Sequence, residues 1–121
     1  MSRTTIIRSM DDLYSLEDVI TVLLVRTDGV VLQSNIPSVY PDPELIKSLE
    51  WVVSAVPSVV MEMQKKNLRK VIYDLESSMI VFYSCSPQIL LIALLEPTAN
   101  LGLLLIELSR TARVIGEALE Y

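Results

Sequence analysis

The sequence predicts an α+β fold whose helices and strands follow one another in the order α-β-β-α-β-β-β-α. Three observations predict it. Five short segments are rich in β-branched and other apolar residues, and two long segments repeat their apolar residues at helical spacing. Asp28 and Gly29 lie between the first two strand segments, and this pair is typical of a tight hairpin that returns over residues 30–34. The length of 121 residues predicts a single domain over residues 1–121.

The chain is expected to begin with a short helix and a buried strand. Ser9 can cap a helix from residue 10 to about residue 16, and Asp11 and Asp12 suit the positive end of the helix dipole. Residues 19–25 are almost continuously apolar, which predicts a strand that is covered on both faces.

A long amphipathic helix is expected in the middle of the chain. Asp42 is its predicted N-cap, and Pro43 is its first residue because proline has no N–H to leave unpaired there. The helix runs to about Lys66, and Pro57 inside it predicts a kink. Its apolar stripe consists of Leu45, Leu49, Val52, Val56, Val59 and Met63. Further apolar residues widen this stripe beyond what one contact with a sheet requires, which indicates a second contact.

Three strands and a final helix complete the predicted fold. The strands cover residues 68–76, 79–85 and 89–95, and Asn100 caps a helix that runs to about residue 119. Because they are apolar on both faces, the strands at 19–25 and 89–95 are expected in the middle of the sheet. The strands at 30–34 and 68–76 alternate with polar residues and are expected at its edges.

The chain is more apolar than one small domain needs. Its mean hydropathy is +0.46, yet its longest unbroken apolar run covers only residues 89–95. A membrane-spanning helix needs about 20 apolar residues, so none is expected. The surplus of apolar side chains indicates a subunit interface, in a protein expected to be cytoplasmic.

The segment Leu-Glu-Pro-Thr-Ala-Asn-Leu-Gly-Leu-Leu at residues 95–104 resembles the signature of the Roadblock (dynein light-chain) family. The hairpin at Asp28 and Gly29 is similar to the family's first hairpin, and the order of elements agrees over nearly the whole chain. Two features depart from the family pattern. Glu17 and Asp18 occupy a place where the family often carries glycines, and Pro57 is unusual in the long helix.

The resemblance implies a profilin-like α/β sandwich. A five-stranded antiparallel sheet would carry the long helix on one face and the N- and C-terminal helices on the other. The resemblance also implies a homodimer formed through the long helix and the edge strand that follows it. Family members regulate or tether Ras-like GTPases, or act as scaffolds in signalling and motor complexes, so the expected partner is a small Ras-like GTPase.

Two sets of residues are candidates for these contacts. The residues expected at the dimer interface are Val52, Val56, Val59, Met63, Arg69, Val71 and Tyr73. Those expected to bind a partner are Trp51, Lys65, Lys66 and Lys70. The partner-binding set has a plainer interpretation: Trp51 can fill the core, and the lysines can be ordinary cations at a helix C-terminus and on a charged edge strand.

The residue types present disfavour an enzyme. The chain has no histidine, which is the commonest general base and metal ligand, and its single cysteine, Cys85, cannot build a zinc site. No catalytic, cofactor-binding or metal-binding residues are therefore expected, and a net charge of −5 disfavours nucleic acid as a partner. The alternative function is a small-molecule sensor domain of profilin-like or PAS-like layout. The sequence leaves open whether the dimer forms with a paralogue.

Overall fold

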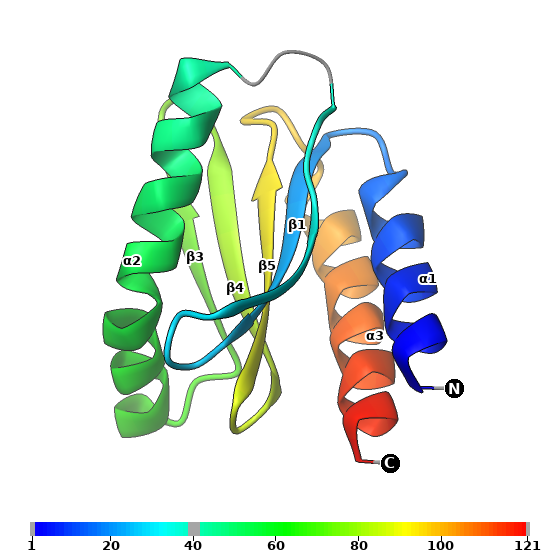
Figure 1. The fold of residues 1–121 in the computed structure, drawn as a ribbon. Helices are drawn as coiled ribbons and strands as arrows, with labels where there is room; N and C mark the ends of the chain where they lie inside the picture. The colour runs from blue at the N-terminus through cyan, green and yellow to red at the C-terminus, as the bar shows by residue number, and fades with distance from the viewer. Residues whose placement is uncertain (1, 39–41, 121) are drawn as a thin grey trace.

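The computed structural model describes residues 2–38 and 42–120 and contains the predicted elements in the predicted order (Figure 1). Their bounds are α1 Ser2–Tyr14, β1 Val19–Arg26, β2 Val31–Asn35, α2 Pro43–Lys66, β3 Lys70–Asp74, β4 Met79–Ser86, β5 Ile89–Leu95 and α3 Leu101–Leu119. The predicted α+β class is confirmed. No helix among the described residues is long and apolar enough to cross a membrane.

The strands form one antiparallel sheet in the order β2-β1-β5-β4-β3. β5 is therefore central and β1 is an inner strand, while β2 and β3 are the two edges, as the polarity of the segments predicted. Every residue of β5 is buried, because helices cover the sheet on both faces.

Helices lie on opposite faces of the sheet (Figure 1): α2 is alone on one face, and α1 and α3 are side by side on the other. Successive strand residues point to opposite faces, so each inner strand contributes to two cores. From β5, Leu91 and Ala93 enter the core beneath α1 and α3, whereas Leu90 and Ile92 enter the core beneath α2.

The first helix is longer than predicted. It begins at Ser2, and Ser9 lies inside it instead of capping it. Met10 and Leu13 enter the core, and Ile6, one turn earlier, packs against the same cluster. Packing of this added turn stabilises a helix start that the local capping signal did not indicate.

The second helix starts as predicted. The Oδ1 atom of Asp42 accepts a hydrogen bond from the backbone N–H of Glu44 at 3.1 Å, and Pro43 is the first helical residue. The helix continues past Pro57, which has no N–H to offer the carbonyl of Val53. The hairpin turn approaches that carbonyl, since a Cβ on Gly29 would lie 3.7 Å from the Val53 oxygen.

The last helix is capped by Asn100, whose Oδ1 accepts a hydrogen bond from the N–H of Leu103 at 3.2 Å. Near its other end the helix backbone lies very close to the sheet. A Cβ atom on Gly116 would lie 2.4 Å from the carbonyl oxygen of Cys85, a distance that real Cβ atoms do not reach. Glycine is therefore required at position 116 by the packing of α3 on β4.

The departure from the family at Glu17 and Asp18 has a local explanation. Asp18 adopts a left-handed backbone with φ of 74°, a region that glycine enters without strain and that aspartate tolerates better than most residues. Its carbonyl accepts a hydrogen bond from the N–H of Glu96 at 2.8 Å. Asp18 thus makes the turn between α1 and β1 in place of a glycine.

Candidate interaction surface at the edge strand

The apolar stripe of α2 is covered by the protein's own sheet. Its predicted dimer contacts Val52, Val56, Val59 and Met63 are at most 4% exposed in the single chain. They pack on the face of the sheet that carries Phe82 and Ile92. The stripe packs into one cluster with residues of β1, β4 and β5, so these four side chains have almost no surface left for a partner.

The edge strand β3 pairs with β4 on one side only. Flanking hydrogen bonds fix which of its peptide groups point toward β4: the carbonyl of Arg69 accepts from Ser84, and the N–H of Leu75 donates to Ser78, both at 2.9 Å. Antiparallel strands alternate between residues that bond to one neighbour and residues that bond to the other. By this alternation, Lys70, Ile72 and Asp74 direct their N–H and C=O groups away from β4, toward the open edge.

An aromatic chain connects the core to this edge. The ring of Phe82, which is fully buried, meets Tyr73 of β3 edge to face at a centroid distance of 5.7 Å. Tyr73 in turn meets Trp51 of α2 edge to face at 5.5 Å. Trp51 is 45% exposed, so it is neither a core residue nor a free surface residue. A large aromatic side chain that is held rigidly and half uncovered is typical of an interface anchor.

The flank of α2 beside Trp51 carries small and charged side chains. At about 100° per residue, Ala55, Ser58 and Glu62 follow Trp51 along the same side of the helix. The carboxylate of Glu62 pairs with the Nζ of Lys66 at 3.3 Å. Because small residues let another helix approach closely, this flank can pack against a second helix better than the bulky stripe beneath it can.

The structure separates the lysines that were expected to bind a partner. Lys65 and Lys66 form the last turn of α2, whereas Lys70 is the first residue of β3. The Nζ of Lys70 lies 5.9 Å from the ring centroid of Tyr83, on the face of the sheet opposite to α2. The structure brings together Trp51 and Tyr73, whose rings are in contact. Val71 and Tyr73 also pack against the buried cluster that holds the predicted residues Val52, Val56, Val59 and Met63.

Sequence reasoning assigned no interface role to Ile72 or Asp74. Both alternate with Val71 and Tyr73 and therefore lie on the other face of the strand. The register with β4 decides which residues of β3 direct their peptide groups outward. This register exists only in the folded sheet.

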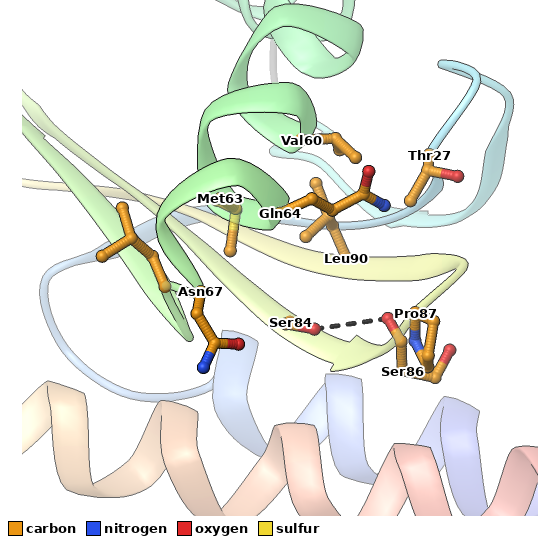
Figure 2. Close-up of a pocket in the computed structure, with 10 residues that line it drawn as sticks. Thr27, Val60, Met63, Gln64, Asn67, Ser84, Ser86, Pro87 and Leu90 are labelled. Carbon is orange, nitrogen blue, oxygen red and sulfur yellow. Dashed lines mark hydrogen bonds between the residues drawn. The ribbon is translucent and has the colours of Figure 1, made fainter.

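A cavity of about 260 Å³ lies between the last turns of α2 and the β4–β5 turn (Figure 2). Val60 and Met63 line it from the helix, and Leu90 from the sheet. The Ser84 hydroxyl donates to the carbonyl oxygen of Ser86 at 3.2 Å, so this polar group is already bonded within the protein. Sites for small ligands measure about 300–1,000 Å³. This cavity is smaller than that range.

The single cysteine lies in a half-buried position on β4. Burial raises the pKa of the Cys85 thiol to about 12, so the side chain is protonated at neutral pH. A thiol reacts as its thiolate, and this environment therefore suits packing and not nucleophilic chemistry. Among the described residues, no group of three or more potential metal-ligating side chains is found.

Comparison with known proteins gives matches at two levels. The AF0774-like protein family matches residues 3–109. No curated protein matches the sequence. Several solved structures share the fold at low sequence identity.

The gliding protein MglB from Thermus thermophilus is 15% identical, with a TM-score of 0.77 over 98% of this chain and 91% of that one. A Roadblock/LC7 domain from Streptomyces avermitilis is 17% identical, with a TM-score of 0.73 over 94% and 97% of the two chains. Myxococcus xanthus MglB is 13% identical, with a TM-score of 0.78 over 97% and 89%. These similarities confirm the predicted Roadblock fold, and the sequence match shows that the chain belongs to the AF0774-like protein family.

Proposed function

We propose that this protein is a homodimeric scaffold that acts by binding a small Ras-like GTPase in the cytoplasm, and not by catalysis. The open edge of β3 is the observation that carries the proposal. An unpaired edge strand of a sheet is a template for another strand and is normally covered, charged or paired. In this protein the edge residues have a pattern that suits pairing with a second copy of themselves.

The pattern is self-complementary about a two-fold axis. If two β3 strands pair antiparallel with Ile72 opposite the partner's Ile72, then Lys70 lies opposite the partner's Asp74. This register uses the outward peptide groups of all three residues. Opposite charges placed across from each other stabilise antiparallel strands, whereas like charges destabilise them.

The α2 flank supports the same arrangement. Joining the two sheets at β3 brings the two α2 helices together on one face, where Trp51 and Ala55 flank the strand. The proposed interface is therefore β3 with Trp51, Ala55, Ser58 and Glu62, in place of the buried stripe. A continuous sheet with paired helices offers a partner a surface that neither chain has alone.

The dimer can be tested without disturbing the fold. Lys70→Asp places two carboxylates opposite each other at both ends of the strand pair, and we expect self-association to weaken at least about tenfold. The double variant Lys70→Asp with Asp74→Lys restores opposite charges and should restore the dimer. Light scattering at micromolar concentration measures the mass of each variant. A wild-type monomer, or a double variant no better than the single one, would contradict the proposed register.

Trp51 provides a second measurement for the same test. It is the only tryptophan in the chain, so its fluorescence reports on one site. Burial in the interface should shift its emission to shorter wavelength as concentration rises, and Lys70→Asp should remove this shift.

The GTPase partner rests on the Roadblock resemblance and needs its own experiment. Wild type and the Lys70→Asp variant are titrated with purified Ras-like GTPases of the same organism, in their GDP and GTP forms. We expect saturable binding by the wild type and loss of binding with loss of the dimer. If the dimer forms and none of these GTPases binds, the partner is wrong while the scaffold interface stands.

A further inference from the structure

A groove lies beneath β3 on the face of the sheet that carries α1 and α3. A helix is about 10 Å wide and strands are spaced by about 4.8 Å, so two helices cover about four strands. α1 packs on β1 and β2, and α3 packs on β4 and β5, which leaves β3 uncovered on this face. Two cavities of about 470 Å³ and 330 Å³ lie between α3 and the β3–β4 pair, and Tyr83, Ser109 and Arg113 line both.

Cations from distant parts of the sequence line this groove. Arg69 directly precedes β3 and Lys70 is its first residue, whereas Arg110 and Arg113 come from α3. The chain as a whole has only ten basic residues and a net charge of −5, so this concentration does not reflect the overall charge. Arg110 pairs with Glu107. In the part of the chain that the structure describes, Arg69 and Arg113 have no carboxylate within ion-pair distance.

Tyr83 supplies an independent observation. Its side chain is only 6% exposed, and within residues 2–38 and 42–120 its hydroxyl makes no hydrogen bond. The hydroxyl oxygen is not itself enclosed, because the described side-chain atoms that are both buried and unbonded belong to Thr21 and Asn35. The Tyr83 hydroxyl can therefore donate a hydrogen bond to a molecule in the groove. Tyr83 lines both cavities, so a molecule in the groove can reach this hydroxyl. The hydroxyl of Ser109 lines the same two cavities from α3.

We propose that this groove binds the phosphoryl group of a small ligand. A phosphoryl group carries up to two charges and several acceptor oxygens, and arginine binds it with two parallel N–H donors. Arg113 and Arg69 would supply the charge, and the Tyr83 and Ser109 hydroxyls would donate the remaining hydrogen bonds. These four residues offer more hydrogen-bond donors and more positive charge than a single carboxylate, with its fewer oxygens and smaller charge, can use. Lys70 adds to the field but is not required, because the proposed dimer uses it at the strand edge. The site is complete within one chain, so it does not depend on the dimer.

The probe for this site is inorganic pyrophosphate, titrated into the whole protein by calorimetry at constant ionic strength. We expect saturable binding of one pyrophosphate per chain. Arg113→Ala and Tyr83→Phe should each weaken it at least about tenfold, since each removes a charge-assisted hydrogen bond. Tyr83→Phe keeps the ring and removes only the hydroxyl, so a loss of binding there is not a loss of packing.

Matched controls separate this site from general charge attraction. Arg8 is exposed on α1, and Tyr14 is a half-buried tyrosine at the end of the same helix. Arg8→Ala and Tyr14→Phe should change pyrophosphate binding less than about twofold. A parallel assay measures sedimentation with phosphatidylcholine vesicles with and without phosphatidic acid, which distinguishes a lipid headgroup from a free phosphate as the source of the phosphoryl group. Arg113-dependent binding in either assay supports the site. No binding in both, or an equal loss in Arg8→Ala, overturns it.

Discussion

The two faces of the sheet are closed in different ways. On the α1 and α3 face, two helices lie side by side and α3 approaches the backbone of β4 so closely that only Gly116 fits against the Cys85 carbonyl. On the α2 face, a single helix packs through side chains, and its core continues through Tyr73 to the half-exposed ring of Trp51.

This difference indicates where each kind of change can be tolerated. Backbone contact leaves no room for an added atom, whereas side chains at the rim of a core can repack around a partner. We therefore expect substitutions near α3 to change the stability of the chain, and substitutions on the rim of α2 to change its association. Equivalent positions on the two faces allow this difference to be measured.

The largest effect is expected from Gly116→Ala. The added Cβ would lie 2.4 Å from a backbone oxygen, so α3 must move away from β4, and we expect a loss of about 3 kcal/mol or more in the free energy of unfolding. Gly102→Ala is the matched control in the same helix, because a Cβ there meets only the Asn100 side chain at 3.7 Å. That variant should gain up to about 1 kcal/mol. Urea denaturation measures both, and equal effects would contradict the close approach.

The next largest effect is expected where the stability of the fold depends on pH, at the same contact between α3 and β4. Burial raises the pKa of Cys85 from 9.0 to about 12, so the unfolded chain loses this proton first as the pH rises. The raised pKa stabilises the fold below pH 9, and this contribution is lost as the pH rises from 9 toward 12. The slope attributable to one thiol is at most about 1.4 kcal/mol per pH unit. Urea denaturation across this range should show a steeper fall in the wild type than in Cys85→Ala. Parallel curves would show that the thiol is not buried as described.

Much of this architecture could be predicted from local patterns. Residues 89–95 are apolar on both faces, and β5 is the central strand. Asp42 and Asn100 were predicted as caps from the residues that follow them, and both side chains make the capping bond. These features depend on neighbours in the sequence, and so the sequence is enough to reveal them.

Contacts between distant segments could not be predicted in the same way. The close approach at Gly116 depends on β4, although a lone glycine inside an amphipathic helix is a recognised sign of tight packing. The four cations of the groove come from two segments far apart in the chain, so sequence reasoning placed Lys70 with the lysines of α2 and Arg69 at the dimer interface instead. The width of the α2 stripe predicted a second contact, but which residues of the helix stay exposed depends on how the helix packs on the folded sheet.

Removing the helix caps should have a smaller effect on the free energy of unfolding, and it again compares the two faces. Asn100→Ala removes the bond to the Leu103 N–H at 3.2 Å, and we expect a loss of about 1 kcal/mol. Asp42→Ala removes the equivalent bond to Glu44 on α2, but Pro43 still fixes the first backbone angle of that helix. The Asp42→Ala loss should therefore be the smaller of the two. Thermal unfolding at equal concentration ranks them, and a larger loss at Asp42 would show that Pro43 does not pre-organise the helix.

The last comparison concerns the two left-handed turns, one on each face. Asp18 joins α1 to β1 with φ of 74°, and Asn67 joins α2 to β3 with φ of 55°. Glycine adopts this conformation without strain, but it also has more freedom to lose on folding. Because asparagine is the better fit to the left-handed region, Asn67→Gly should change the free energy of unfolding by no more than a few tenths of a kcal/mol. Asp18→Gly should be stabilising, by up to about 1 kcal/mol.

Alanine at the same positions provides the control. Asp18→Ala and Asn67→Ala both place a Cβ in the left-handed region without a polar side chain to support the turn, so each should be destabilising by about 1 kcal/mol. Urea denaturation of the four variants measures these differences. If Asp18→Gly lowers the free energy of unfolding, then the Asp18 side chain supports the turn more than its backbone strain opposes it. Aspartate in place of the family's glycine would then stabilise the turn on the face that carries α1 and α3, and would not merely be tolerated there.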